Sequence, residues 1–453
     1  MTSYPLIQLG EIASPERGSI AIGPFGSRMK ADTYTKEGVP VVRGTNISTG
    51  KSLVGDWVFV PQELANAMAN CVAKPGDLVL PHRGSIGEVA FIGAEFPQIV
   101  LSSSMMKFRP DPAVADGEFI YYFLKSEAGR NEILRFGSQV GTPGIGQPLT
   151  SLRQVRVPLP PLIVQQNIAR TLSALDDKIE LNRRMNETLE AMAQAIFRDW
   201  FVDFGPTRRK LAGLTDAVEI MGGLVQQPAR AAELAALFPN AIGDNGLPEG
   251  WEVEALLSQA DWVNGAAYKN MHFSDAPDAL PVIKIAELKA GVTGTTMRTN
   301  SQLGERYRIK DGELLFSWSG NPDTSIDTFV WTGGDAWLNQ HIFAVRENGK
   351  RSATYLHTLL RYLRPQFAEL ARNKQTTGLG HVTKENMSRL LVTRPTPELS
   401  IWFDHIVDPI HQRFRSTLFE NQTLTATRDL LLPKLMSGEI RLRDAERIAE
   451  AAQ

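Results

Sequence analysis

The amino-acid sequence predicts two α/β (α+β) domains in a pseudo-twofold repeat. Each domain is followed by a long helix, and the two helices are expected to form an antiparallel coiled coil. Three observations predict this fold: the chain repeats itself over about half its length, two heptad-patterned segments share the offset of that repeat, and short apolar runs alternate with glycine and proline in each globular part. A chain of 453 residues is also too long for one ordinary hydrophobic core.

The internal repeat is the main signal. Four segments of the first half have counterparts in the second half, at offsets between 234 and 241 residues: Val39–Arg43 with Leu280–Lys284, Lys74–Val79 with Lys310–Leu315, Gly144–Gly146 with Gly378–Gly380, and Asn186–Leu189 with Asn421–Leu424. The matches occur in the same order along the chain, and the small drift in offset indicates insertions and deletions in loops. Such a pattern favours a duplicated unit.

The repeat divides the chain into six parts. These are a first domain over 1–160, a helix over 161–204, a linker over 205–247 with one short helix around Ala229–Leu237, a second domain over 248–396, a helix over 397–440 and a tail over 441–453. Short apolar runs predict strands of a mixed sheet at Val39–Val42, Leu78–Leu80 and Val89–Ile92. Helices inside the domains are predicted at Phe119–Leu124 and Tyr355–Leu363.

The two long helices carry a heptad pattern. Alternate steps of four and three from Ile168 to Trp200, and the same steps 235 residues later from Phe403 to Leu435, select mainly apolar residues. Prolines precede both segments, where a helix start tolerates them. Two unconnected amphipathic core helices are the alternative, which leaves the shared offset unexplained. Asn186 and Asn421 fall near the middle, either buried and fixing the register or exposed at a frayed seam.

Composition excludes several classes of site. A single cysteine, Cys71, rules out an internal disulfide framework, and the seven histidines show no metal-ligand spacing. We expect no signal peptide and no bilayer-spanning segment, and therefore a cytoplasmic protein. The net charge of −2 divides into +1 for each domain and −2 for each remaining segment, 161–245 and 396–453, so any basic surface is expected on the domains.

Catalytic motifs are missing as well. An adenine methyltransferase needs a polar-Pro-Pro-aromatic motif, but Leu162 follows the one Pro-Pro, and Asn321–Asp323 lacks the second proline and the aromatic. The sequence has no P-loop and no Gly-x-Ser-x-Gly elbow. We interpret the glycine-rich segment Gly141–Gly146 as a loop or turn. The chain is expected to have no catalytic activity and no cofactor of its own.

Several segments resemble those of the specificity subunits of type I restriction–modification systems. They are Pro160–Gln165 followed by Ile168, Phe197–Phe204, Gly76–Val79, Gly84–Gly87, Leu338–His341 and, most specifically, Leu431–Ile440. Val164 stands where that family usually has Glu, and Ser400 where Gln is expected. The resemblance covers nearly the whole chain and includes the repeat.

The resemblance implies that each domain reads one half of a bipartite double-stranded DNA target. The helices would set the spacer between the halves and dock two modification (methyltransferase) subunits, which carry S-adenosylmethionine and methylate one adenine in each half. Two restriction subunits would add translocation and cleavage that use ATP and Mg. The chain would then act in the cytoplasm at the nucleoid.

Base reading needs donors and acceptors on loops that reach the major groove. The candidates are Arg43, His82, Arg83, Ser85, Ser102, Ser103, Gln139 and Gln147 in the first domain, and Lys284, Ser319, Asn321, Asn339, Gln340, Gln375 and His381 in the second. Lys107, Arg109, Lys310 and Arg346 are predicted phosphate contacts. For each residue, a solvated loop or a structural hydrogen bond is the alternative, and His82–Arg83 before Gly84 is the strongest candidate. Trp318, Trp331 and Trp337 are expected in the core.

Two other functions compete with this hypothesis. A helical scaffold that binds only proteins fits the heptads equally well and predicts no steep salt dependence of DNA binding in the presence of the partner. A fused restriction–methylation enzyme is disfavoured by the missing cofactor and catalytic motifs.

Overall fold

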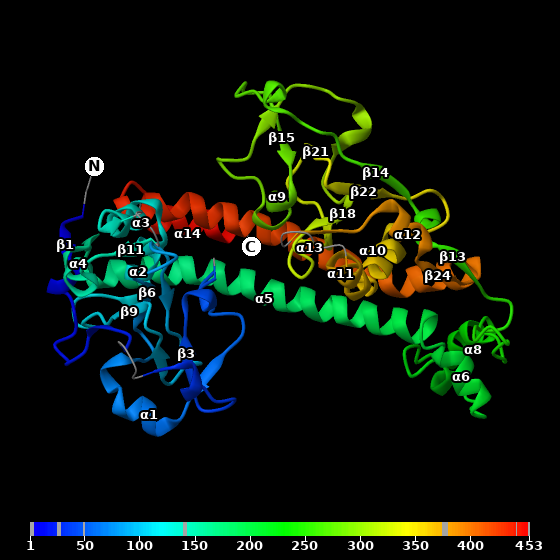
Figure 1. Ribbon diagram of the computed structural model, residues 1–453, viewed down its shortest axis with the longest axis horizontal. Helices are drawn as coiled ribbons and strands as arrows, with labels where there is room; N and C mark the ends of the chain where they lie inside the picture. The colour runs from blue at the N-terminus through cyan, green and yellow to red at the C-terminus, as the bar shows by residue number, and fades with distance from the viewer. Residues whose placement is uncertain are drawn as a thin grey trace. The chain divides into compact units, whose positions relative to one another are not determined.

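The computed structural model describes residues 4–24, 29–48, 50–138, 143–373, 379–440 and 442–451. The chain divides into two compact units, and each is described by itself. Unit 1 comprises Met1–Leu181 and Glu420–Gln453, and unit 2 comprises Asn182–Phe419. Each unit holds one sheet-containing domain together with a segment of both long helices, α5 (Leu162–Phe201, green in Figure 1) and α13 (Pro397–Ser437, orange to red).

The domain of unit 1 is built on two four-stranded sheets. The first has the order β2-β9-β6-β7 and the second the order β4-β3-β8-β5. The strand bounds are Ile20–Ile22 (β2), Val39–Val42 (β3), Val58–Val60 (β4), Val72–Ala73 (β5), Leu78–Pro81 (β6), Ala90–Phe91 (β7), Ile99–Leu101 (β8) and Met105–Phe108 (β9). The pair β3–β8 is parallel and the remaining pairs are antiparallel, which confirms the predicted mixed sheet.

Short elements complete unit 1. Strand pairs join β1 (Leu6–Gln8) to β12 (Arg156–Pro158) and β10 (Gly137–Ser138) to β11 (Gly144–Ile145). The helices are α1 (Gln62–Ala67), α2 (Gly117–Lys125), α3 (Glu127–Leu134), α4 (Pro148–Gln154) and α14 (Leu442–Ala451).

Unit 2 repeats this topology strand for strand. Its sheets have the orders β14-β22-β18-β20 and β16-β15-β21-β17, again with one parallel pair, β15–β21. The bounds are Asp261–Asn264 (β14), Leu280–Ile283 (β15), Arg298–Thr299 (β16), Arg308–Ile309 (β17), Leu314–Ser317 (β18), Asp327–Val330 (β20), Ala336–Leu338 (β21) and Ile342–Arg346 (β22). The predicted duplication is therefore present in the strand order and in the pairing.

The smaller elements of unit 2 follow the same plan. Strand β13 (Glu252–Ala255) pairs with β24 (Leu391–Arg394), and β19 (Ser319–Gly320) pairs with β23 (Gly380–His381). The helices of the domain are α9 (Ile285–Ala290), α10 (Ala353–Tyr362), α11 (Arg364–Arg372) and α12 (Lys384–Arg389). The linker holds α6 (Gly205–Leu211), α7 (Ala217–Ile220) and α8 (Pro228–Ala236).

Strands β6 and β18 lie at the centre of their domains. All four residues of each strand are buried, because both faces of the sheet are covered. Leu78 and Leu80 face the core that α2 shares with the long helices, whereas Val79 faces the core on the other side of the sheet. Leu314, Phe316 and Leu315 alternate in the same way in unit 2. This alternation follows from the two-residue period of a strand.

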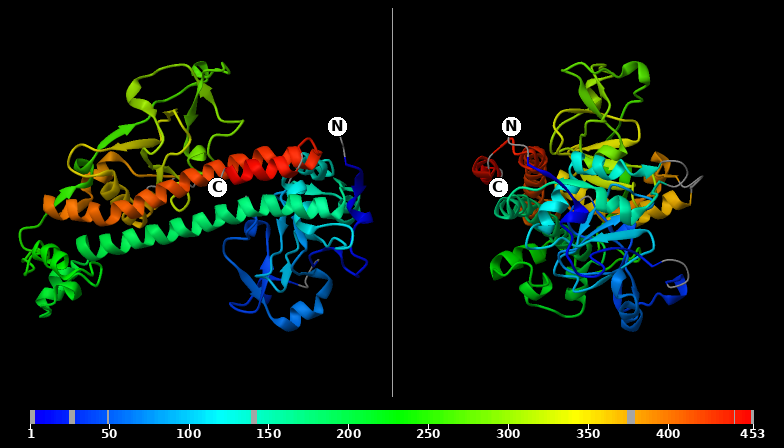
Figure 2. Two further views of the ribbon diagram at one scale, coloured as in Figure 1. Left: turned by 180° about the vertical axis from the view of Figure 1, so that it is seen from behind. Right: turned by 90° about the vertical axis from the view of Figure 1, so that its left-hand side faces the viewer.

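The long helices pack against each other in each unit and run antiparallel. In unit 1, Asp176 contacts Arg428, and Asn421 Nδ2 donates to Ile179 O at 3.3 Å, so residue numbers rise on α5 as they fall on α13. In unit 2 the Phe197 and Phe403 rings are 5.9 Å apart, and Asn186 accepts a hydrogen bond from Thr417. In Figure 2, left, the α13 segment of each unit runs alongside its α5 segment. The heptad seam is confirmed, and the alternative of two unconnected helices is excluded.

Most of the predicted elements are observed, with small shifts at their ends. The strand Val39–Val42 has the predicted bounds, and the predicted strand Val89–Ile92 shortens to Ala90–Phe91. Asn186 is buried in the seam, not exposed. The linker contains three short helices instead of one, and Phe238 from its end packs 5.3 Å from the Trp200 ring. The tail is also structured, since α14 buries Ala445 and Ala449.

Candidate nucleic-acid interface

Three loops meet at the end of strand β6 in unit 1. We call residues 82–88, 102–104 and 143–147 together loop set 1. The His82 backbone N–H donates to Ser104 O at 2.9 Å, and His82 O accepts from the Ile145 N–H at 2.9 Å. Gly84 N–H donates to Pro143 O, also at 2.9 Å. Backbone hydrogen bonds therefore hold three segments that are distant in sequence in one fixed arrangement.

Unit 2 builds the same frame at the end of β18. Loop set 2 comprises residues 318–326, 339–341 and 379–383. Trp318 takes the place of His82: its N–H donates to His341 O at 3.4 Å, and its carbonyl accepts from Val382 N–H at 2.8 Å. The pairing of Ser319 with His381 corresponds to the bridge between Arg83 and Gly144. The duplication thus extends to individual hydrogen bonds.

Two equivalent glycines allow a close backbone contact beneath each loop set. Gly23 N–H donates to Met105 O at 2.8 Å, and Gly265 N–H donates to Ile342 O at 3.0 Å. A Cβ at Gly23 would lie 1.8 Å from Ser102 O, and one at Gly265 would lie 2.1 Å from Asn339 O. No side chain fits at such distances, so each turn depends on a glycine.

Arg83 and Ser85 form the exposed tip of loop set 1. Positive φ angles at Gly84 (83°) and Gly87 (89°) shape the tip. Its base is fixed because Ile86 is buried and Glu88 pairs with Lys125 and Arg130. Among the described residues, the Arg83 guanidinium has no hydrogen-bond or ion-pair partner. The tip therefore presents an unpaired cation from a rigid support.

His82, in contrast, is a structural residue. Its side chain is buried, and its Nε2 lies 3.0 Å from Ser103 O. Burial lowers the pKa of His82 below its ordinary value of 6.5, so the ring is neutral at pH 7. That His82 reads DNA stays a prediction; in this structure its ring holds the neighbouring turn. Ser102 is also buried, whereas Ser103 and Gln147 are exposed in the same loop set.

Loop set 2 carries rings where loop set 1 carries a cation. The half-buried Trp318 ring lies 5.4 Å from the His341 ring and 5.8 Å from the His381 ring, and its Nε1 donates to Asn264 Oδ1 at 3.0 Å. Ser319 Oγ is 2.9 Å from His381 Nδ1. Exposed Gln340 lies beside them, with its Nε2 3.3 Å from His341 Nε2.

Sequence reasoning missed two members of loop set 2. Trp318 was expected in the core, and it packs half-buried against the core of unit 2, whereas Trp331 and Trp337 are fully buried. His341 was noted only as part of a family motif. Burial and the nearby His381 lower the pKa of His341, and its buried Nδ1 has no hydrogen-bond partner among the described residues. Alignment of Trp318 with His82 through the repeat was the signal that could have found the ring cluster.

Three of the four predicted phosphate contacts are structural ion-pair residues. Arg109 forms two hydrogen bonds to Asp77, at 2.6 and 2.9 Å, and Arg346 lies 2.9 Å from Glu313 at the equivalent place in unit 2. The Lys107 side chain is only 3% exposed, and its Nζ is 3.7 Å from Asp77. Burial lowers the pKa of Lys107, whereas Asp77 raises that of Arg109. Phosphate contact by these three residues stays a prediction, and in this structure each of their cationic groups lies beside a carboxylate. Lys310 is exposed.

The remaining candidates differ in how accessible they are. Arg43 and Lys284 follow equivalent strands, where Arg43 Nη2 donates to Asp56 O at 2.5 Å and the Lys284 ammonium lies 5.4 Å from the centre of the Phe273 ring. Asn339 is buried, and Asn321 Oδ1 accepts from two backbone N–H groups of its own loop. Two further candidates, Gln139 and Gln375, lie outside the described residues.

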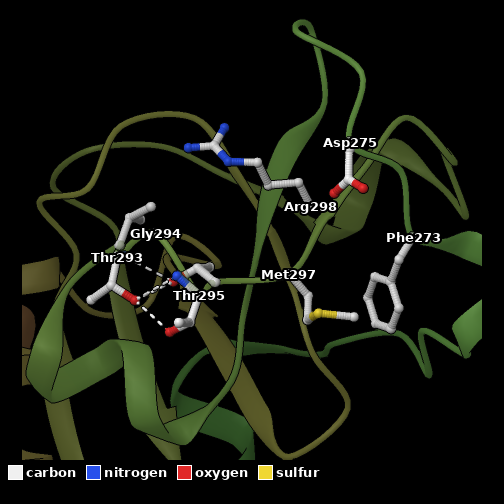
Figure 3. Close-up of a pocket in the computed structure, with 9 residues that line it drawn as sticks. Phe273, Asp275, Thr293, Gly294, Thr295, Met297 and Arg298 are labelled. Atoms are coloured by element: carbon white, nitrogen blue, oxygen red, sulfur yellow. Dashed lines mark hydrogen bonds between the residues drawn. The ribbon is translucent and has the colours of Figure 1, made fainter.

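A separate hollow of about 400 Å³ lies beside β16 in unit 2. In Figure 3 the Met297 side chain points toward the Phe273 ring, and the threonines gather at the other end. Thr293 Oγ1 is 3.0 Å from Thr295 Oγ1, and Arg298 Nη1 donates to Ala279 O at 3.0 Å. Thr293, Thr295 and Arg298 thus already have partners within the unit.

The described residues contain no cluster of His, Cys, Asp and Glu that could hold a metal ion. Within the same ranges, every helix is too short or too polar to cross a membrane.

Comparison with known proteins shows which proteins the chain resembles. Residues 23–191 match the type I restriction modification DNA specificity domain. The chain is 27% identical over 425 residues to the HindI specificity subunit of Haemophilus influenzae, covering 84% of this chain and 91% of the relative. It is 23% identical to the MjaIX specificity subunit of Methanocaldococcus jannaschii, covering 82% and 78%.

A solved structure supports the same assignment at the level of the fold. The type I restriction–modification S subunit from M. genitalium superposes with a TM-score of 0.52 at 15% identity, covering 95% of this chain and 96% of that one. The chain is thus similar to type I restriction enzyme specificity subunits over more than four fifths of its length, and its residues 23–191 match a DNA specificity domain.

Proposed function

We propose that the chain reads a bipartite double-stranded DNA target, one half with loop set 1 and the other with loop set 2. The observation that carries this proposal is that the two loop sets share one backbone frame but carry different side chains. Arg83 and Ser319 occupy equivalent backbone positions, as do His82 and Trp318. A common frame with exchanged side chains is what a pair of readers for two different base sequences requires.

The preorganised frames favour DNA reading over a purely protein-binding scaffold. A scaffold needs no exposed donors on rigid loop tips, whereas base readout needs side chains held within a fraction of an ångström of the productive geometry. Arg83, Ser85 and Ser103 in unit 1, and Gln340 in unit 2, are exposed on loops that backbone hydrogen bonds fix. Lys310 is retained as a phosphate contact in this proposal.

We further propose that the long helices set the spacer between the half-sites and dock two modification subunits that carry S-adenosylmethionine. Two restriction subunits that use ATP and Mg would complete the assembly. The continuous helices α5 and α13, with 40 and 41 residues, support a rigid spacer. A helix rises about 1.5 Å per residue, so four residues inserted after Asn182 would add roughly 6 Å.

Methyl transfer tests the proposal. The purified chain is expected to transfer no methyl group, and the chain with its modification partner is expected to methylate adenine in both halves of one motif. The motif of the helix-insertion variant should keep both half-sites and lengthen the spacer by about one or two base pairs, at roughly 3.4 Å per base pair. Methylation by the isolated chain would contradict the recognition role, and an unchanged spacer would leave the helices as a docking platform only.

A further inference from the structure

We propose that the two loop sets read their half-sites with opposite chemistry, an inference that rests on the proposed function. Arg83 donates two hydrogen bonds to O6 and N7 of a guanine in one half-site. Loop set 2 reads the other half-site with uncharged groups, and the Gln340 amide contacts an adenine. Arginine pairs bidentately with guanine and glutamine with adenine, since the donor and acceptor pattern of each side chain matches the edge of that base in the major groove.

Arg83 is an unpaired cation of unit 1. Several other cations of the unit are neutralised by carboxylates: Arg109 pairs with Asp77 and Glu16, Arg130 and Lys125 with Glu88, Arg135 and Arg156 with Glu132, and Lys51 with Glu118. Arg83 has no such partner among the described residues. It is also the one lysine or arginine in loop set 1. An unpaired guanidinium keeps all five donors for a ligand.

The position of Arg83 favours a base over a phosphate. Its backbone bridges to Gly144, so the residue lies where the loops after β6 and before α4 meet. Exposed Ser85, Ser103 and Gln147 belong to the same loop set and carry no charge. Phosphate contacts need only a cation at the rim, whereas Arg83 stands on a tip fixed by Ile86 and Glu88. A rigidly held, planar guanidinium surrounded by neutral donors suits the edge of a base.

Loop set 2 has no lysine or arginine among its described residues, 318–326, 339–341 and 379–383. Ser319, which replaces Arg83, is buried and its hydroxyl is engaged by His381. Asp323 is the one carboxylate of the set, and Arg372 pairs with it at 2.8 Å while Arg364 donates to its backbone carbonyl at 3.0 Å. The set itself therefore carries one paired carboxylate and no cation, and the Lys289 ammonium from outside the set donates to Thr324 O.

Gln340 is the base-reading side chain that this neutral set offers. It is exposed and follows Asn339, whose N–H is fixed by a hydrogen bond to Ile283 O at 3.0 Å. Its amide touches the His341 ring, which packs on Trp318. The ring cluster of Trp318, His341 and His381 supports the amide, as Ile86 and Glu88 support the loop that carries Arg83.

The test uses the chain in complex with its modification subunits and determines the methylated motif by selection from a randomised DNA pool. The wild-type motif should contain a guanine in one half and an adenine, besides the methylated one, in the other. Arg83→Ala and Arg83→Lys should both relax the guanine position by about 10- to 100-fold, which corresponds to the 1–3 kcal/mol of one bidentate contact. Gln340→Ala should relax one A·T position in the other half only.

Arg83→Lys separates a base contact from a phosphate contact, because lysine keeps the charge but lacks the planar fork. Arg17→Ala, an exposed cation of unit 1 outside the loop set, is the matched control and should leave the motif unchanged. A wild-type motif without guanine, an unchanged motif in Arg83→Lys, or an equal loss on all sequences would overturn the inference. Failure of the wild-type complex to select any motif would instead reject the proposed function. Thermal melting of each variant confirms that it is folded.

Discussion

In each unit the domain packs against the long helices, but the polar groups at this contact differ between the two units. In unit 1 the domain meets the long helices through Tyr122, Asp176 and Arg428: the Tyr122 hydroxyl donates to Asp176 at 2.8 Å, and Arg428 Nη1 lies 2.7 Å from the same carboxylate. In unit 2 the residue 235 positions after Asp176 is His411, whose ring lies 4.8 Å from that of His357. Thr358 takes the place of Tyr122, with its Oγ1 3.4 Å from His411 Nε2.

This difference shows which part of the duplicated fold is fixed. The strand order, the loop frames and the two glycines beneath them are kept in both units. The buried polar groups are exchanged, and unit 1 relies more on buried ion pairs. The Asp77 and Lys107 side chains are 1% and 3% exposed, whereas those of Glu313 and Arg346 are 24% and 33% exposed. The two units should therefore respond differently to loss of a carboxylate and to acid.

The largest effect is expected from Asp77→Asn. The substitution leaves the buried Lys107 without a counter-charge and Arg109 with Glu16 alone, and removing one partner of a buried pair costs about 3–5 kcal/mol. The equivalent change in unit 2, Glu313→Gln, should lower the free energy of unfolding by only about 1 kcal/mol, because that pair is more exposed to water. Hydrogen exchange followed by peptide measures each unit separately. Equal losses in the two units would contradict the difference in burial.

Alanine at either of the two glycines beneath the loop sets should cause the next largest loss in the free energy of unfolding. Gly23→Ala and Gly265→Ala force a Cβ onto a backbone carbonyl oxygen, so the turn must move, at a cost of about 3 kcal/mol in its own unit. Gly146→Ala and Gly294→Ala are matched controls, since a Cβ there meets nothing within 4 Å. Chemical denaturation monitored by hydrogen exchange gives the loss for each unit. If the controls were as damaging as the two tests, the close approach would not be the cause.

A smaller effect is expected from pH, and it should be larger in unit 2, where two packed histidines have lowered pKa values, than in unit 1, where His82 has one. Burial and Arg415 hold the pKa of His411 at about 4, below its ordinary 6.5, although Asp408 acts in the opposite direction. Burial also lowers the pKa of His357. The unfolded chain therefore binds more protons between pH 6.5 and 4, and the free energy of unfolding falls as the pH falls through that window. His411 alone should account for about 2 kcal/mol between pH 7.5 and 5.

His411→Gln removes the titrating group, so the free energy of unfolding of unit 2 should depend less on pH. Any loss of stability that the substitution itself causes is the same at both pH values. Unfolding measured from pH 7.5 to 5 in the wild type and in the variant checks this. A wild-type unit 2 whose stability stays constant over the range would show that the histidine pair is accessible to water.

The fold could be predicted further than the site. Repeated segments such as Lys74–Val79 and Lys310–Leu315 indicated equivalent strands, and the heptads indicated the antiparallel seam, because both patterns are periodic along the chain. The partners of Lys107 and Arg109 could not be predicted, since Asp77 lies about thirty residues away and only the sheet brings it near. The burial of His82 and the partial exposure of Trp318 could not be predicted for the same reason. Burial at a strand end depends on the loops above it, which carry no periodicity.

Cross-linking tests most directly the claim that each unit reads its own half-site. Ser85 and Asn321 lie on the tips of loop sets 1 and 2, and Cys71 is the single cysteine of the chain. In a Cys71→Ser background, Ser85→Cys and Asn321→Cys would each carry a thiol-linked photo-cross-linker in the complex with modification subunits and target DNA. The proposed function predicts that position 85 cross-links only to bases of one half-site and position 321 only to bases of the other. Cross-links from both positions to the same half-site would contradict it.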